Sequence, residues 1–164
     1  MSTWSNGIAG ACLTVLLFGG AGVAQAQDEN PTAQQTAAIR ACADKNQDDV
    51  TEAERQCLFE LVAEPCQQTP EGQSNVGVAD CFRLEAKIWD DLLNENYKNL
   101  RDVIDAAQAA KLRDMQRAWI ASRDATCAFY DVKIQGTMAI PMGAACIARE
   151  TARRAMLLKF FTRL

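Results

Sequence analysis

Six cysteines and the lack of histidine limit the chemistry that this chain can perform. The sequence has seven cysteines and no histidine, and one cysteine, Cys12, lies in an N-terminal apolar segment that we expect export to remove. An even set of cysteines behind an export signal is typical of a disulfide framework. Without histidine, the chain lacks both the commonest general base and the commonest metal ligand. The remaining cysteines are Cys42, Cys57, Cys66, Cys81, Cys127 and Cys146.

Helix geometry restricts how these cysteines can pair. Cys57 and Cys66 fall in or just past one expected helix, so about 13 Å separates their Cα atoms, beyond the limit of about 7 Å for a disulfide. In contrast, each of the three irregular connections of the chain has one cysteine shortly before it and one shortly after it. We therefore expect the pairs Cys42–Cys57, Cys66–Cys81 and Cys127–Cys146. A redox or metal site is the alternative, but no Cys-x-x-Cys spacing exists and no histidine can assist, so we expect no metal and no cofactor.

The elements that position these cysteines are expected to be helices. Apolar residues recur every three to five positions along most of the chain, and no alternating strand pattern is present. A capping box of Thr51 and Glu54 predicts a helix that Pro65 ends. Whether the following long helix breaks near residues 106–110 is left open. The sequence predicts helices over 33–45, 51–64, from 78 onward, from 111 onward and from 143, with loops at 65–77 and 136–141. The fold class is thus an all-α, disulfide-stapled antiparallel helical bundle of about four to five helices.

The N-terminal segment is expected to be an export signal. Residues 8–23 are apolar or small and carry no charge, and Ala24-Gln25-Ala26 has the small-x-small pattern of a cleavage site. We expect a signal peptide over residues 1–26 and a single domain over residues 27–164. The apolar segment is short and rich in glycine for a membrane span. Cys12 has too short a leader for an acylated cysteine, so we expect no membrane anchor and a periplasmic or secreted protein.

The charge of the chain favours some partners over others. Lys and Arg number 17, Asp and Glu number 21, and the formal net charge is −4. All of these residues lie after residue 26. An acidic chain is a poor candidate for nucleic acid or for anionic membrane surfaces, and a better one for a cationic protein.

The helix expected after residue 111 carries polar residues on the same face as its core residues. Gln116 and Arg123 share a helical face with Trp119 and the cysteine at 127, so each needs a polar partner. Glu85 and Glu150 each follow a cysteine by four residues, and either is expected to pair with Arg123. The cluster of Glu85, Gln116, Arg123 and Glu150 is interpreted as a buried ion pair that fixes helix register. The alternative is a binding surface.

Acidic residues gather around an aromatic pair on the long helix. Asp90, Asp91 and Glu95 lie between Trp89 and Tyr97. Paired carboxylates can act as an acid and base couple, but adjacent residues on a helix point about 100° apart. We favour a solvated acidic face that receives a basic protein. After residue 26 the chain has only Ser74 and Ser122 as serines, with no histidine to activate them, so we expect no enzyme activity.

Three motifs resemble those of a known family. They are Cys81-x3-Glu85-x3-Trp89-x3-Leu93-Asn94-x2-Tyr97-x2-Leu100, then Leu112-Arg113-x2-Gln116-Arg117-Ala118-Trp119-Ile120-x2-Arg123-Asp124-x2-Cys127, then Cys146-x4-Thr151-x2-Arg154. Over about residues 78–160 the chain resembles the lysozyme inhibitor LprI-like domain family. The resemblance implies a small exported helical protein with Trp89, Tyr97 and Trp119 in its core. It carries over no catalytic residue.

Two functional hypotheses follow. The first is a periplasmic non-enzymatic binding protein that inhibits a lysozyme-type muramidase. Such enzymes are commonly cationic, with two carboxylates in the cleft, so an acidic protein is attracted to them and a basic side chain can enter the cleft. The loop at 67–77 has no basic residue, and Lys133 near the second loop is the better candidate. The second hypothesis is an envelope structural or stress-related module with an endogenous protein partner.

Overall fold

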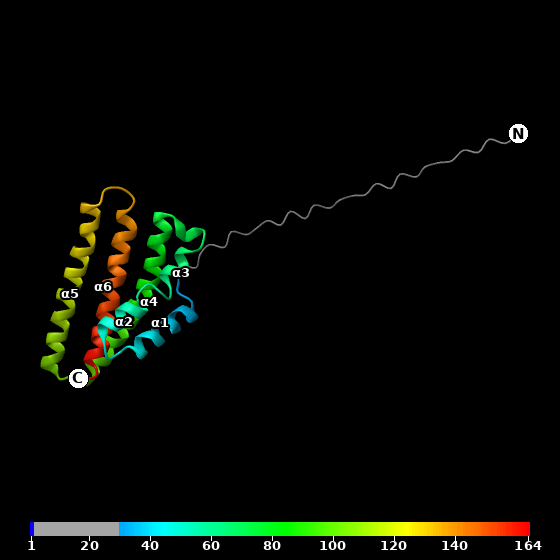
Figure 1. Cartoon of the computed structure of the whole chain (residues 1–164). Coiled ribbons are helices and arrows are strands. Elements are labelled where there is room, and N and C mark those ends of the chain that lie inside the picture. The colour runs from blue at the N-terminus through cyan, green and yellow to red at the C-terminus, as the bar shows by residue number, and fades with distance from the viewer. Residues whose placement is uncertain (2–29) are drawn as a thin grey trace.

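The computed structural model describes Met1 and residues 30–164, and Figure 1 shows its three long helices side by side. Apart from Met1, the expected signal peptide, including Cys12, lies outside the described residues. The described part contains six α-helices and one 3-10 turn, and no strand. They are α1 (Ala33–Lys45), α2 (Val50–Cys57), α3 (Ala63–Gln67), η1 (Glu71–Gln73), α4 (Asn75–Val103), α5 (Ala106–Lys133) and α6 (Ala139–Phe161). The all-α fold class is confirmed.

The segment expected to form one helix over 51–64 forms two. Asp49, and not Thr51, is the N-cap of α2, because its carboxylate accepts hydrogen bonds from the backbone N–H groups of Thr51 and Glu52 at 2.9 and 3.0 Å. The chain leaves the helix after Cys57 and turns at Phe59, whose φ is 72°. The prediction that Pro65 ends the helix is wrong. Pro65 lies in the first turn of α3, where a helix does not need the N–H that proline lacks.

Side-chain caps set the ends of the long helices. Ser74 accepts a hydrogen bond from the Gly77 N–H at 3.0 Å, so α4 begins at Asn75, three residues before the expected start. Asp105 and Gln108 form a capping box with hydrogen bonds of 2.8 and 3.0 Å. This box starts α5 and settles the open question about the long helix, which breaks at Ile104 and Asp105. At the other end, Pro141 lies within the first turn of α6 and not in the loop.

The core forms mainly between α4 and α6. Ile88 and Trp89 from α4 and Leu158 from α6 are completely buried. Ala152 and Ala155 on α6 are also buried, and their small side chains allow close packing of the two helices. The helix α6 also packs against α2 and α5. Only three residues of α5 are buried, namely Leu112, Gln116 and Cys127, so α5 is attached to the bundle through α6.

Three disulfides join neighbouring parts of the chain. The Cα–Cα distances are 5.7 Å for Cys42–Cys57, 5.6 Å for Cys66–Cys81 and 5.4 Å for Cys127–Cys146, all in the usual range. These are the pairs expected from the sequence. They connect α1 to α2, α3 to α4 and α5 to α6. No described helix combines the length and apolar character that a membrane span requires.

Candidate functional site

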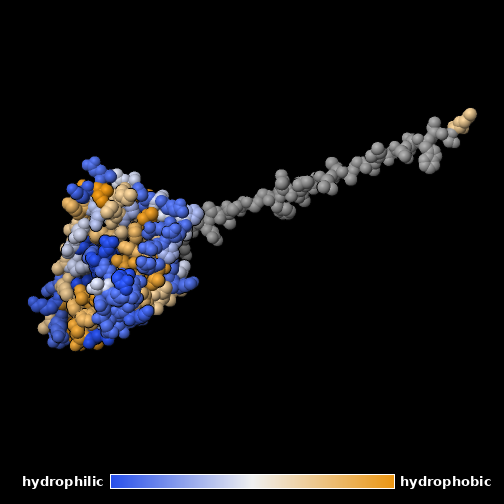
Figure 2. All heavy atoms as spheres, in the orientation of Figure 1, coloured by the Kyte–Doolittle hydropathy of each residue, from blue (hydrophilic) through white to orange (hydrophobic). Residues whose placement is uncertain are grey.

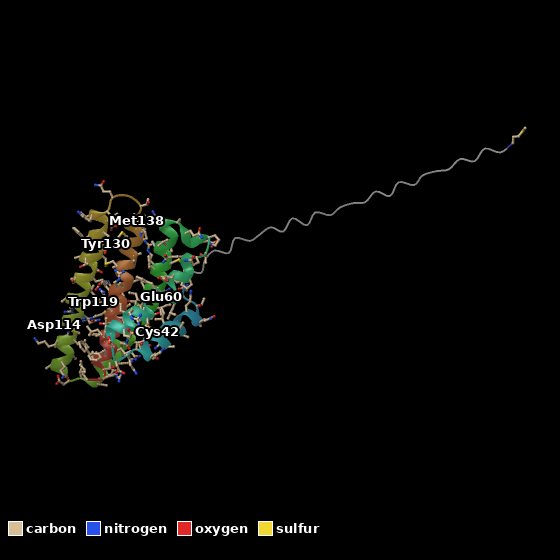
Figure 3. All side chains as sticks on the ribbon, in the orientation of Figure 1. Cys42, Glu60, Asp114, Trp119, Tyr130 and Met138 are labelled. Atoms are coloured by element: carbon tan, nitrogen blue, oxygen red, sulfur yellow. A yellow bond between two sulfur atoms is a disulfide. The ribbon has the colours of Figure 1, made fainter. Side chains whose placement is uncertain are left out.

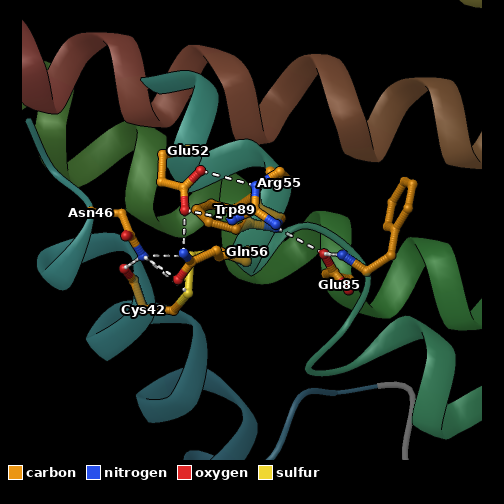
Figure 4. Close-up of a disulfide and its surroundings, with 9 residues drawn as sticks. Cys42, Asn46, Glu52, Arg55, Gln56, Glu85 and Trp89 are labelled. Carbon is orange, nitrogen blue, oxygen red and sulfur yellow. Dashed lines mark hydrogen bonds and ion pairs between the residues drawn. A yellow bond between two sulfur atoms is a disulfide. The ribbon is translucent and has the colours of Figure 1, made fainter. Parts of the chain in front are cut away.

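The structure does not bring the expected polar cluster together. Glu85 lies in the core, where its carboxylate accepts hydrogen bonds from the backbone N–H groups of Phe59 and Ala63 at 2.8 and 3.0 Å and from Trp89 Nε1 at 3.0 Å. Figure 4 shows this carboxylate beside Trp89. Burial raises the pKa of Glu85, while its three hydrogen bonds oppose that shift. Glu85 therefore supplies the hydrogen-bond acceptor for the backbone N–H groups of Phe59, between α2 and α3, and of Ala63, at the start of α3. It does not pair with Arg123.

The other members of the cluster also have different partners from those expected. Arg123 pairs with Asp124 at 2.8 Å, and Glu150 pairs with Arg153 at 3.0 Å. Gln116 accepts a hydrogen bond from Arg154 Nε. The pairing of Arg123 with Glu85 or Glu150 is thus wrong, because Arg123 reaches the carboxylate next to it in the chain.

Sequence reasoning missed the role of Arg154. This residue is only 7 % exposed, and burial lowers its pKa. Its guanidinium lies 5.5 Å from the centre of the Trp119 ring, and that of Arg123 lies 4.9 Å from it. Arg154 is not among the residues expected from the sequence to form the polar cluster. Its helical spacing of three from Thr151, which is also buried, could have indicated an inward position.

The acidic face on α4 is exposed but partly neutralised. Asp90, Asp91 and Glu95 are all exposed. Arg40 donates two hydrogen bonds to Glu95, at 2.9 and 2.8 Å, and holds the pKa of Glu95 below its ordinary value. Asp90 accepts a hydrogen bond from Asn94 at 3.0 Å. In the part of the chain that the structure describes, no group of three cysteine or acidic side chains is placed to hold a metal ion.

The α5–α6 hairpin tip, which we define as residues 127–146, stands at one end of the bundle (Figures 1 and 3). Lys133 is exposed in the last turn of α5, and the connection turns at Gly136, whose φ is 88°. The disulfide Cys127–Cys146 secures the base of the tip. Its loop is tied to the start of α4, since Asn75 Nδ2 donates to Thr137 Oγ1 at 2.8 Å. Lys133 is therefore presented on a stapled support.

Large apolar side chains are exposed at the same tip. Phe129 is 59 % exposed, Val132 76 % and Met138 53 %. Figure 2 shows apolar side chains beside strongly hydrophilic ones at the end of the bundle where the α5–α6 connection lies. An exposed apolar group near a charged residue is typical of a protein-binding surface.

A groove of about 560 Å³ runs beside the tip, between α4 and α5. Asp124, Ala128 and Asp131 line it from α5, and Arg83 and Ala86 line it from α4. Its floor comes from α6 and includes Gly143, Ala144 and Ile147. We call this the α4–α5 groove. It exists because α4 and α5 each pack on α6 and these facing residues are mostly small.

Comparison with known proteins gives one match. The sequence model of the family described as lysozyme inhibitor LprI matches residues 66–158. The chain belongs to this family. The matched region spans the three long helices with two of the disulfides, Cys66–Cys81 and Cys127–Cys146, and it includes the tip and the α4–α5 groove. The helices α1 and α2 lie outside it. No curated protein and no solved structure matches the chain. The family description is that of an inhibitor and not of an enzyme.

Proposed function

We propose that this chain is an exported, non-enzymatic binding protein that inhibits a lysozyme-type muramidase. The observation that carries the proposal is the family match over the three long helices. The net charge of −4 supports it, because an acidic protein is attracted to a cationic enzyme over distances comparable to the Debye length. Asp90 and Asp91 contribute to this attraction more than Glu95, whose charge Arg40 balances.

Inhibition by the hairpin tip fits the geometry best. A muramidase cleft is concave and contains two carboxylates, and the tip offers Lys133 on a stapled support with exposed apolar residues around it. Entry of the Lys133 ammonium between the carboxylates would place a cation where the substrate must bind. Phe129 and Val132 would supply apolar contact area at the cleft edge.

A lysis assay tests the proposal. Purified, oxidised protein spanning residues 27–164 is mixed with c-type and g-type lysozymes at micromolar excess, and the rate of cell-wall lysis is measured. We expect inhibition of at least one enzyme. The variant K133E should lose most of it, while the matched variant K98E, at an exposed lysine of α4, should keep it. No inhibition of any lysozyme, with capture of an endogenous envelope protein instead, would favour the second hypothesis of an envelope interaction module.

Export is part of the same proposal. Cleavage after Ala26 would leave a mature protein that starts at Gln27, with six cysteines and no membrane anchor. Mass spectrometry of the protein recovered from the periplasm or the medium measures this directly. Recovery of the uncleaved chain from the cytoplasm would contradict it.

A further inference from the structure

The α4–α5 groove is continuous with the hairpin tip. Asp131 lines the groove and lies two residues before Lys133, and Ile140 lines it just after the α5–α6 connection. A protein that binds the tip therefore also meets the mouth of the groove. The base of the tip, at Cys127, belongs to the groove wall as well. The groove and the tip therefore adjoin along α5, although Asp131 and Lys133, two residues apart on the helix, point to different sides of it.

The charges inside the groove are unequally balanced. Asp124 is paired with Arg123 at 2.8 Å, and Arg83 on the opposite wall is paired with Asp80 at 2.6 Å. Asp131 forms no ion pair with any of the residues that the structure describes. Asp124 and Asp131 are seven residues apart, so they lie on one face of α5, about 10 Å from each other. Among the residues that the structure describes, Asp131 is thus a groove carboxylate without an ion-pair partner.

The shape of the groove suits a long side chain with an apolar stem. Gly143 and Ala144 on the floor and Ala86 and Ala128 on the walls leave space above α6, and Ile147 adds an apolar surface. The stems of lysine and arginine pack on such surfaces while their charged ends reach a polar group. A guanidinium or ammonium lying over this floor can reach Asp131, whereas Asp124, about 10 Å away on the same face of α5, is already paired with Arg123.

We propose that the α4–α5 groove binds a basic side chain, lysine or arginine, from the surface that surrounds the cleft of the muramidase. This proposal rests on the proposed function and deepens it. Lys133 then meets the acidic cleft of the enzyme, and Asp131 meets a basic side chain on the cationic surface around that cleft. The arrangement specifies the orientation of the partner, since rotating the complex would bring like charges together.

Binding measurements with a charge variant and a steric variant test the proposal. Asp131→Asn removes the carboxylate, and Ala128→Leu fills the groove at an exposed wall position without a change of charge. The probe is the c-type or g-type lysozyme that the wild type inhibits, and the readouts are the dissociation constant and its salt dependence. We expect each variant to bind about tenfold more weakly, because Asp131→Asn loses one charge-assisted contact and Ala128→Leu excludes the basic side chain from the groove. Circular dichroism and thermal unfolding confirm that the variants fold.

A matched control separates the groove from net charge. Asp114→Asn makes the same change of charge on an exposed residue of the same helix, about 25 Å from Asp131 along its axis. We expect it to bind within about twofold of the wild type. Equal effects of Asp131→Asn and Asp114→Asn would overturn the groove proposal in favour of general attraction. A wild type that forms a dimer which Asp131→Asn dissociates would overturn it in favour of a second copy as the occupant.

The same experiment distinguishes a failure of the groove proposal from a failure of the proposed function. If the wild type binds and K133E abolishes binding, while Asp131→Asn and Ala128→Leu have no effect, the groove proposal alone is wrong. If the wild type binds no lysozyme, the proposed function is wrong and the groove proposal falls with it.

Discussion

Trp89 Nε1 donates a hydrogen bond of 3.0 Å to the carboxylate of Glu85, one turn earlier on α4. Both residues are completely buried. The same carboxylate accepts two backbone N–H groups, one from Phe59 in the connection between α2 and α3 and one from Ala63, the first residue of α3. A single acidic side chain thus links the central helix, its largest core residue and the backbone where the chain turns between α2 and α3. Glu85 is a structural residue, and its burial is accounted for by the donors around it.

Replacing Glu85 should destabilise the fold strongly. Glu85→Ala leaves three buried N–H donors without an acceptor, and we expect a loss of about 3 kcal/mol in the free energy of unfolding. Urea denaturation measures the loss. Glu95→Ala is the matched control, because the Arg40–Glu95 pair is exposed and should contribute less than about 1 kcal/mol. Similar losses in both variants would show that the buried hydrogen bonds of Glu85 have no special weight.

The stability should also depend on pH through Glu85. Burial raises its pKa above the ordinary value of 4.5, so the folded state binds the proton more tightly than the unfolded state. The stability that this group contributes is fully present below its unfolded pKa and is lost as the pH rises through its folded pKa. Glu95, whose pKa Arg40 lowers, acts in the opposite direction and loses its contribution as the pH falls.

Glu85→Gln removes this titration. Its difference in unfolding free energy from the wild type should therefore be larger at about pH 4 than at about pH 8. Urea denaturation of the two proteins at several pH values gives the difference directly. A difference that stays constant across this range would contradict the raised pKa.

Removing the disulfide at the base of the hairpin tip should cost stability. The Cys127–Cys146 bond spans a sequence separation of 19 residues, and the chain-entropy model gives a stabilisation of about 3 kcal/mol for such a loop. The double variant C127S/C146S should lose about this amount in thermal or urea unfolding. Mass spectrometry after thiol labelling, without reduction, checks the starting point. A free thiol among the six cysteines of the oxidised wild type would disagree with three disulfides.

Two adjacent arginines on α6 should respond very differently to alanine. Arg154 is buried against Trp119 and donates to Gln116, so Arg154→Ala leaves a cavity and an amide without its partner. We expect a loss of about 3 kcal/mol. Arg153 is exposed and forms surface pairs with Glu54 and Glu150, so Arg153→Ala should cost less than about 1 kcal/mol. Equal unfolding midpoints of the two variants would contradict this assignment.

The helices and disulfides could be predicted because local signals determine them. The spacing of apolar residues indicates the long helices. A disulfide requires short Cα–Cα distances, so only the cysteines on either side of a short connection are expected to pair. The extra break at Phe59 could not be found in this way. It depends on Glu85, which lies 26 residues later in the chain and supplies the acceptor for the Phe59 N–H. No local pattern contains that information.

The partners of polar side chains were the least predictable part of the site. Helical periodicity correctly indicates that Gln116 faces inward, but it gives no choice among the charged residues on neighbouring helices. Arg154 reaches Gln116 because α5 packs on α6 at that level, and Arg123 pairs with its neighbour Asp124. The α4–α5 groove was also missed, since it depends on small residues of three separate helices, namely Ala86, Ala128 and Gly143, facing the same space.

The central position of α6 imposes an order on the assembly of the protein. The helices α2, α4 and α5 all pack against α6, yet α6 follows all three of them in the chain. The core therefore cannot close until α6 has been synthesised. Cys42–Cys57 and Cys66–Cys81 both precede α6 and can form while the chain is still arriving, whereas Cys146 lies within α6 itself. The second cysteine of the third pair is therefore the last of the six to be synthesised, and the tip that carries Lys133 is secured only after the two N-terminal disulfides have had the opportunity to form.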